Sequence, residues 1–466
     1  MFRMRPGHDP GYILSVLTRR SFLMAATGSL TASRWIRLGA QNRPVPSRAQ
    51  LDWQRDELAV FVHFGVNTLT DREWGDGTED PAIFNPSRLD ARQWARAAKA
   101  GGARAMILTA KHHDGFCLWP TKTTGHSVAN SPWRDGRGNV VREFVDACRE
   151  HDLKAGLYLS PWDRNAKVYG DSPRYNEFYR AQLTELLTQY GRIDEVWFDG
   201  ANGEGPNGKK QIYDWPKTWD LTLKLQPEAV IFSDAGPGVR WIGNENGVAG
   251  ETNWSTVDPA VVPVPGASGP AVTKMLREGD PNGSVWRPGE TDVSIRPGWF
   301  NHPAEDARVR TVENLVSLYF TSVGRNSKLL LNVPPTRDGL LHDIDVERLT
   351  GMRATLDELF KNDLTRGRAL KWRKTGDRSA TAEVDLGRTA AIAIADLGEQ
   401  IEHGQSVARY ILEHSSDGAN WLPLSHGTTI GYRKLDRFAP TLVRRVRLTI
   451  SDAIATPRPV SLGLYA

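Results

Sequence analysis

The sequence predicts an α/β protein, a (β/α)8-like TIM barrel followed by a C-terminal β-sandwich. Between about residues 51 and 362, short apolar runs alternate with amphipathic helical patterns, as in the βα units around a parallel sheet. From about residue 363 the pattern changes to period-two alternation with frequent Gly and Asp turns, which is typical of an antiparallel sandwich. We therefore expect the barrel at residues 51–362 and a sandwich of the galactose-binding-like kind at 363–466.

Length and composition fit two folded modules and exclude several classes of protein. The chain has 466 residues, and its 39% hydrophobic and 24% charged residues are ordinary for a folded protein. The formal net charge is only +4, so nucleic acid is not expected as a partner. Sixteen Trp residues are many for this length, and flat aromatic rings suit the apolar faces of sugars.

Residues 1–40 have the pattern of a twin-arginine signal peptide. Thr18–Met24 contains two adjacent arginines, and Ala25–Ala32 is a weakly apolar run of mostly small residues. Arg34 and Arg37 interrupt this run well before the roughly 20 apolar residues that a membrane span needs. We expect a bacterial protein that is periplasmic or secreted and has no stable membrane anchor. An ordinary N-terminal helix is the alternative.

The predicted elements follow one another in the order that a barrel and a sandwich require. The apolar runs that we assign to barrel strands are Leu58–Phe64, Arg104–Thr109, Lys154–Ser160, Glu195–Asp199, Ala229–Ser233 and Lys328–Val333. Apolar residues at helical spacing predict helices at Ala91–Ala100, Val140–His151, Tyr175–Tyr190, Ala304–Ser322 and Asp343–Leu359. The strand candidates of the sandwich are Ala380–Leu386, Ala391–Ala395, Ala408–His414 and Arg444–Ile450. Because fewer than eight barrel strands are clear, we infer closure of the barrel from the alternation.

Each of the first four predicted strands runs into polar or ionisable residues. These are His63, then Lys111 to Asp114, then Ser160 to Asp163, and finally Asp199. In a (β/α) barrel, the carboxyl ends of the strands and the loops after them build the active site. The sequence therefore predicts a single pocket at this end of the barrel.

Two carboxylates in one pocket would suit the hydrolysis of a glycosidic bond. Asp199 ends an apolar strand beside Trp197, and a glycosidase that retains configuration needs one carboxylate fixed under the anomeric carbon. The alternative role for Asp199 is to cap the following loop. A second carboxyl, for general acid and base catalysis, has three candidates, Glu245, Glu251 and Glu290. All three lie among glycines, which predicts loops, and their spacing does not choose between them.

The cysteines and histidines lack the spacing of a metal site. Cys117 and Cys148 lie outside any Cys-x-x-Cys or Cys/His cluster, and we expect both thiols to be free and buried. His112 and His113 are adjacent and would point to opposite faces of a continuing strand, unlike the spaced ligands of metal-dependent barrels. With His63, they could instead bond hydroxyl groups, because a neutral ring has one donor and one acceptor. A purely structural role is the alternative, and no metal is expected.

Five motifs, taken together and in this order, resemble glycoside hydrolase family 29, the α-L-fucosidases. They are Phe61–Gly65, Glu73–Gly75, Lys111–Phe116, Trp197–Gly200 and Leu331–Pro335. Three further segments resemble the branch that prefers α-1,3/4-linked fucose, and they are Gly156–Asn165, Gly243–Glu245 and Ser294–Phe300. The resemblance extends from about Leu51 to the C-terminus, because the family also carries a C-terminal β-sandwich.

The resemblance implies an exo-acting hydrolase that removes terminal L-fucose from an oligosaccharide or glycoprotein glycan by retaining double displacement, without a cofactor. It implies Asp199 as the nucleophile. The Gly-Asn-Glu context makes Glu245 the first choice for the acid/base. Glu290 and then Glu251 stay open as alternatives, because this element varies across the family. The fucose pocket that the resemblance implies consists of His63, Glu73, Trp74, His112, His113, Tyr158, Trp197 and Trp299.

Two other functions stay open at this point. One is a non-catalytic barrel that binds fucose or another glycan, and the other is a glycosidase for a different sugar, such as an α-galactoside. Fucose has a methyl group at C6, so a pocket closed by aromatic rings would favour it over galactose. The C-terminal module either braces the barrel or binds glycans, and we expect bracing because its strands show no run of exposed aromatic residues.

Overall fold

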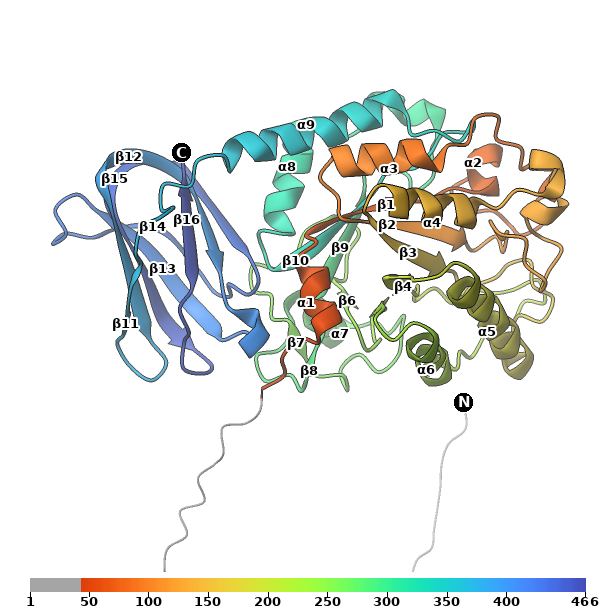
Figure 1. Ribbon diagram of the computed structural model, residues 1–466. Helices are drawn as coiled ribbons and strands as arrows, with labels where there is room; N and C mark the ends of the chain where they lie inside the picture. Colours follow the sequence, from red (N-terminus) through yellow and green to blue (C-terminus); the bar gives the residue numbers. More distant parts are fainter. Residues whose placement is uncertain (1–42) are drawn as a thin grey trace, which may run out of the picture. The chain divides into compact units, whose positions relative to one another are not determined.

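The computed structural model describes residues 43–466, which form one compact unit, so the predicted signal at residues 1–40 lies outside the described residues. Eight parallel strands form the main sheet, in the order β5-β4-β3-β2-β1-β10-β9-β6 (Figure 1). Their bounds are β1 (Leu58–Val62), β2 (Ala105–Lys111), β3 (Lys154–Leu159), β4 (Glu195–Trp197), β5 (Val230–Phe232), β6 (Arg240–Trp241), β9 (Gly289–Ser294) and β10 (Ser327–Asn332).

The two edge strands of this sheet meet and nearly close it into a barrel. Phe232 of β5 forms a parallel bridge with Val239, one residue before β6. The Val239 N–H donates to the Ile231 carbonyl at 2.9 Å. Gly238 permits this approach, because a Cβ at that position would lie 2.4 Å from the same carbonyl oxygen. The predicted TIM barrel is confirmed.

Two barrel strands, β6 and β9, were not predicted. β6 has only two residues, and β9 carries two carboxyl side chains, Glu290 and Asp292, within six residues. The prediction that Glu290 lies in a loop is therefore wrong. Alternation along β9 turns Glu290 and Asp292 toward the barrel interior, while Val293 joins the outer core.

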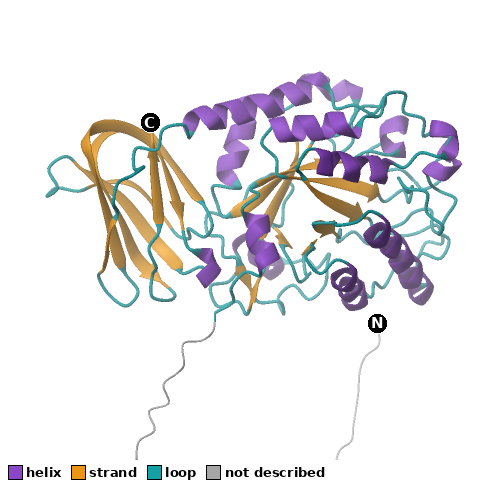
Figure 2. Ribbon diagram, viewed as in Figure 1, coloured by secondary structure: helices purple, strands orange, loops and turns teal. Residues whose placement is uncertain are grey.

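Helices cover the outside of the barrel, as Figure 2 shows, and in residues 43–466 none is long and apolar enough to cross a membrane. The predicted helices Ala91–Ala100 and Asp343–Leu359 coincide with α3 and α9. The predicted helix at Ala304–Ser322 is instead a 3-10 turn, Pro303–Arg308, followed by α8. The remaining bounds are α1 (Arg48–Gln54), α2 (Val66–Thr70), α4 (Val140–Glu150), α5 (Ser172–Gln189), α6 (Trp215–Leu225), α7 (Pro270–Glu278) and α8 (Val312–Thr321).

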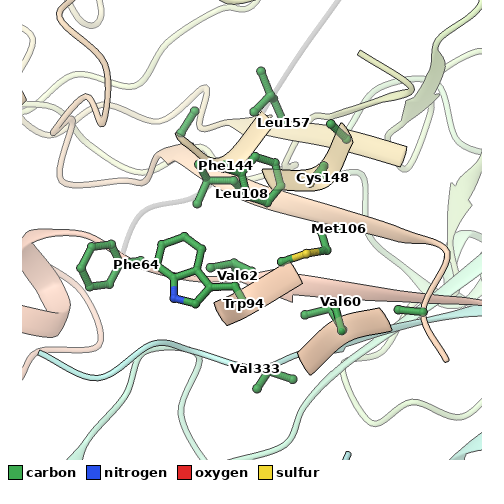
Figure 3. Close-up of a cluster of buried hydrophobic side chains, with 14 of the residues drawn as sticks. Val60, Val62, Phe64, Trp94, Met106, Leu108, Phe144, Cys148, Leu157 and Val333 are labelled. Carbon is green, nitrogen blue, oxygen red and sulfur yellow. The ribbon is translucent and has the colours of Figure 1, made fainter. Parts of the chain in front are cut away.

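The main core fills the space between the strands and these helices. Outward-facing Val60 and Val62 of β1 pack with Trp94 of α3, which is completely buried (Figure 3). α3 begins after Asp90, whose carboxylate accepts the Arg92 N–H at 2.9 Å and so satisfies a free helix donor. Both cysteines are free and buried, as expected.

The C-terminal module is an antiparallel sheet folded around its own core. Its strand order is β11-β12-β15-β13-β14, and β16 pairs with β12. Two predicted strands, Ala380–Leu386 and Ala391–Ala395, belong to the single long strand β12, whose register with β15 shifts twice. The bounds are β11 (Lys371–Lys374), β12 (Ala380–Gly398), β13 (Val407–Ser415), β14 (Leu422–Gly427), β15 (Lys434–Ala453) and β16 (Ser461–Tyr465). A two-stranded ribbon, β7 (Thr256–Val257) with β8 (Val285–Trp286), completes the described strands.

Arg433 joins this module to the barrel. Its guanidinium lies 2.9 Å from Glu57 Oε2, one residue before β1, and 2.7 Å from Asp396 Oδ2 in β12. The Tyr319 hydroxyl of α8 donates to the same Glu57 carboxylate at 2.6 Å. These side chains are largely buried, so the contact holds the start of β1 against the module.

Candidate active site

The candidate residues meet at the carboxyl ends of the barrel strands, as predicted for a barrel enzyme. His63 follows β1, His112 and His113 follow β2, and Asp199 lies two residues after β4. The loops after β6 and β9 add Glu245 and Trp299. The first four predicted strand ends therefore do contribute to one site, and two further strands complete it.

Asp199 is held by two donors and remains partly open. The Tyr158 hydroxyl donates to Asp199 Oδ2 at 3.0 Å, and the Ala201 N–H donates to Oδ1 at 2.7 Å. The carboxylate is 28% exposed, and His113 Nε2 lies 3.8 Å from its Oδ2. Burial and the charge of Asp199 raise the pKa of Tyr158 well above its usual value, so the phenol keeps its proton and donates.

The hydrogen-bond network assigns the tautomer of His113. The Ser160 hydroxyl donates to the Trp162 carbonyl at 2.6 Å, so its oxygen accepts the bond from His113 Nδ1 at 2.7 Å. Burial lowers the pKa of His113, although Asp199 opposes the shift. A neutral ring with its proton on Nδ1 leaves Nε2, the atom nearest Asp199, as an acceptor for a sugar hydroxyl.

The hydrogen-bond network also assigns the tautomer of His63. The amide nitrogen of Asn332 donates to Ser294 and to the Trp299 carbonyl, so its oxygen accepts from His63 Nδ1 at 2.8 Å. Burial lowers the pKa of His63 to about 3, which keeps the ring neutral. His63 thus also offers Nε2 as an acceptor.

His112 and His113 lie side by side, and they do not point to opposite faces as they would on a continuing strand. Their ring centroids are 4.1 Å apart, because β2 ends at Lys111 and the strand alternation stops there. His112 also stacks on Tyr158 at 5.9 Å. Its Nδ1 is buried without a protein partner among the described residues, which leaves both ring nitrogens uncommitted to the protein.

Aromatic rings form the floor and one rim of the site. Trp197 stacks on Phe232 at 3.8 Å with its ring nearly parallel, and Phe61 packs against Trp197 at 5.3 Å. Trp74 is 59% exposed, and its ring centroid lies 6.2 Å from that of Trp162. Trp74 therefore lines the rim of the site rather than its floor.

Glu73 is occupied by backbone donors. Its Oε1 accepts the Trp299 N–H at 2.6 Å, and its Oε2 accepts the Phe300 N–H at 3.3 Å and lies 3.0 Å from His302 Nε2. In this structure Glu73 therefore fixes the loop after β9.

Glu245 reaches the site from the loop after β6. The Trp299 indole N–H donates to Glu245 Oε2 at 3.3 Å, and the residue is otherwise exposed. Partial burial of the carboxyl raises the pKa of Glu245, the Trp299 hydrogen bond opposes the shift, and the charges of Asp199 and Glu73 add to it. A carboxyl with a raised pKa beside a second carboxylate suits a general acid.

The other two acid/base candidates lie elsewhere. Glu290 is fully buried, accepts the Trp197 indole N–H at 3.0 Å and lies 3.8 Å from Lys328. Glu251 is 81% exposed and lies 3.4 Å from Arg325. Of the three, only Glu245 contacts a residue of the candidate site from the open end of the barrel.

Sequence reasoning missed several residues of the site. Asp292 is buried and accepts the Trp241 indole N–H at 2.8 Å. Burial raises the pKa of Asp292 well above the usual range, and the charge of Glu245 adds to this shift. Asn332 and Ser160 set the two histidine tautomers, and His302 holds Glu73. The alternating pattern of β9 could have revealed Asp292, and Asn332 and Ser160 lie at the ends of β10 and β3, beside the strands that lead to His63 and His113. Only the contact of His302 with Glu73 joins loops that are distant in the sequence.

A cavity of about 630 Å³ lies at the opposite end of the barrel, lined in part by Trp53, Lys154, Glu195 and Lys328. It includes none of the candidate site residues. Within residues 43–466, no group of three or more His, Cys, Asp or Glu side chains has the arrangement of a metal site.

Comparisons with known proteins point to one family. The family model described as Alpha-L-fucosidase matches residues 70–358. Alpha-L-fucosidase 1 of Arabidopsis thaliana is 42% identical over 451 residues, covering 91% of this chain and 87% of that protein. A glycoside hydrolase 29 family member from an unknown rumen bacterium has a crystal structure with a TM-score of 0.83 at 42% identity, covering 91% and 77%. A Ruminococcus gnavus GH29 fucosidase in complex with fucose gives 0.82 at 31% identity, covering 91% and 95%.

Proposed function

The chain belongs to glycoside hydrolase family 29 and is an alpha-L-fucosidase, and on this premise we propose that it is a retaining enzyme with Asp199 as nucleophile and Glu245 as acid/base. The observation that carries the proposal is the pairing of a fixed, partly open Asp199 carboxylate with a Glu245 carboxyl of raised pKa. Its substrate class is a fucosylated oligosaccharide or glycoprotein glycan.

Asp199 attacks C1 of fucose while the bond from C1 to the leaving oxygen breaks and Glu245 gives that oxygen its proton. Tyr158 and the Ala201 N–H hold both carboxylate oxygens, which fixes the attack direction. No lysine or arginine pairs with Asp199 within residues 43–466, so no full counter-charge reduces its nucleophilicity.

Glu245 changes role between the two steps. Once Asp199 is esterified, its negative charge disappears, and with it one of the causes that raise the pKa of Glu245. The Glu245 carboxylate then accepts a proton from water as the water attacks C1, and the C1–Asp199 bond breaks. Fucose leaves with its configuration retained.

Paired variants test these roles. Asp199→Ala is expected to abolish turnover with the fold intact, and azide is expected to restore part of the hydrolysis of an activated aryl fucoside by replacing the nucleophile. Glu245→Gln is expected to impair natural glycans far more than the activated fucoside, because a good leaving group needs little acid help. Full activity of Asp199→Ala would remove the nucleophile assignment, and equal losses in Glu245→Gln would remove the acid assignment.

The pocket chemistry supports fucose as the sugar. The neutral His63 and His113 each offer an Nε2 acceptor to sugar hydroxyls. The Trp197 ring, which packs against the buried rings of Phe61 and Phe232, supplies apolar surface that suits a sugar with a methyl at C6.

A preference for α-1,3/4-linked fucose is proposed from the segments Gly156–Asn165, Gly243–Glu245 and Ser294–Phe300. The assay compares fucose release from an aryl α-L-fucoside, an α-1,2-linked and an α-1,3/4-linked fucosyl oligosaccharide. Release largely confined to the α-1,3/4 glycan supports the preference, and comparable release from the α-1,2 glycan contradicts it.

Twin-arginine export to the periplasm or outside the cell is proposed from Arg19 and Arg20. Replacement of both by lysine is expected to retain the enzyme in the cytoplasm of a bacterial host. Unchanged export of the doubly substituted protein would contradict this route.

A further inference from the structure

His302 connects loops on the rim of the site and has no part in the mechanism above. Its Nδ1 lies 2.8 Å from Asp71 Oδ1, and its Nε2 lies 3.0 Å from Glu73 Oε2. Ionised carboxylates only accept hydrogen bonds, so both ring nitrogens must donate. A histidine that donates from both nitrogens is an imidazolium.

Charges of alternating sign surround this ring. Asp71, in the loop after β1, also lies 3.4 Å from Arg337 in the loop after β10. A further carboxylate, Glu305, faces His302 from the 3-10 turn and pairs with Arg308 at 3.2 Å. Burial alone would lower the pKa of His302, but the surrounding carboxylates outweigh it and raise the pKa above the usual 6.5.

Glu73 bonds to three residues of the loop after β9, namely Trp299, Phe300 and His302 itself. One carboxylate accepts the N–H groups of both Trp299 and Phe300, and His302 holds that carboxylate from the far side. Gly298 is part of this packing, because a Cβ there would lie 2.9 Å from Glu73 Oε2 and 2.9 Å from His302 Cδ2. Glu73 thus holds the loop after β9 at Trp299 and Phe300 on one side and at His302 on the other, and we call this set of contacts the clasp.

The clasped loop carries the only recorded hydrogen-bond donor to the Glu245 side chain within residues 43–466, the Trp299 indole N–H at 3.3 Å. We propose that His302 is a positioning residue whose imidazolium, held between Asp71 and Glu73, fixes the loop that carries Trp299 and so directs the Glu245 carboxyl toward the leaving group. The inference rests on the proposed role of Glu245. It adds a residue that touches neither the sugar nor the reacting atoms.

Two amide variants separate this role from simple packing. The amide nitrogen of His302→Gln comes near the place of Nε2 and can still donate to Glu73, whereas that of His302→Asn comes near the place of Nδ1 and reaches only Asp71. Both variants lose the charge, and asparagine is also shorter than glutamine by one methylene group. His302→Asn is therefore the test variant, and His302→Gln is its matched control.

The first measurement is kcat/KM for a fucosyl oligosaccharide and for an activated aryl fucoside, in both variants and in Glu245→Gln. His302→Asn is expected to lose roughly 10- to 100-fold on the oligosaccharide and only a few-fold on the aryl fucoside, while His302→Gln recovers most of the loss. Equal losses on both substrates, or no rescue by glutamine, would overturn the proposal. If Glu245→Gln itself shows no dependence on the leaving group, the acid/base assignment fails instead.

The second measurement is the indole ¹H–¹⁵N resonance of Trp299, identified by its loss in Trp299→Phe. It is expected to move in His302→Asn and to stay near the wild-type position in His302→Gln. In the wild type it should titrate at a pH above 6.5, as His302 loses its proton and one of its two donors. An indole resonance that is unaffected by His302→Asn would show that the clasp does not position Trp299.

Discussion

The buried carboxyl of Glu290 allows a quantitative test of the charge arrangement inside the barrel. Glu195 lies 3.0 Å from Lys328 and Glu290 lies 3.8 Å from the same ammonium, so two carboxyls face one cation. Burial and the charge of Glu195 raise the pKa of Glu290 well above its usual value, although Lys328 opposes the shift. Of the two carboxyls, we expect Glu290 to keep its proton well above the pH at which a free glutamic acid loses it.

Glu290→Gln replaces a protonated carboxyl by a neutral amide of the same shape. Its Oε1 can still accept the Trp197 indole N–H, and its amide nitrogen can donate to Glu195. In the unfolded chain Glu290 titrates near pH 4.3, about its reference value, and in the folded chain it titrates higher. Between these values the folded state holds one more proton, so wild-type stability is complete below the lower pKa and falls as pH rises.

The amide of Glu290→Gln does not titrate, so the free energy of unfolding of the variant increases relative to that of the wild type as the pH rises. The difference in free energy of unfolding is expected to increase by about 1.4 kcal/mol per pH unit above the unfolded-state pKa, until the raised pKa of the folded state is reached. This slope does not depend on small differences in packing. Urea unfolding of both proteins at several pH values measures it, provided that the m-values agree.

The matched control is Glu195→Gln, which removes the closer carboxylate partner of the buried Lys328 ammonium and is expected to lose up to about 3–5 kcal/mol. Activity of Glu290→Gln should stay within about threefold of wild type on both substrate types, since the residue is remote from the leaving group. A stability difference that is flat across this pH range would refute the charge assignment. A selective loss on natural glycans would return Glu290 to the list of acid candidates.

Three further outcomes follow from contacts described above. Trp299→Phe removes the donor that lowers the pKa of Glu245, so the alkaline limb of kcat/KM on a fucosyl oligosaccharide should move to higher pH, and an unmoved limb would contradict that contact. The pKa of His63 is about 3 in the folded state, so below pH 6.5 the unfolded state binds more protons than the folded state. The free energy of unfolding should therefore fall by about 2 kcal/mol when the pH is lowered to 5. His63→Gln should reduce this fall, as measured by urea unfolding. Arg433→Met leaves two carboxylates unpaired and should cost about 2 kcal/mol or more, against less than about 1 kcal/mol for the exposed Arg445→Met; equal costs would contradict the brace.

Sequence patterns predicted the parts of the barrel that are apolar. Val60, Met106 and Ile231 lie in continuous apolar segments and pack in the outer core. Strands of a parallel sheet are buried on both faces and need such segments, so these strands were recognisable from the sequence. β9 was missed because the interior of this barrel is polar at Glu290 and Asp292, and a strand with inward carboxyls looks like a loop. β6 is too short to carry any periodicity.

The site was predictable where a strand end presents its residue directly. Asp199, His63 and His113 follow their strands so closely that the barrel geometry places them. The clasp at His302 was not predictable, because His302 and Glu73 are 229 residues apart and meet only after the barrel has closed. The same holds for Asn332 and His63, which are 269 residues apart.

The Arg433 brace has a consequence for the order in which the protein can mature. Glu57 and Arg433 are separated by 376 positions, so a ribosome makes nearly the whole chain before Glu57 receives its counter-charge. β1 likewise waits for its second neighbour, β10. The brace can therefore form only when synthesis is nearly complete, whereas β10 can pair with β1 while the C-terminal module is still being made.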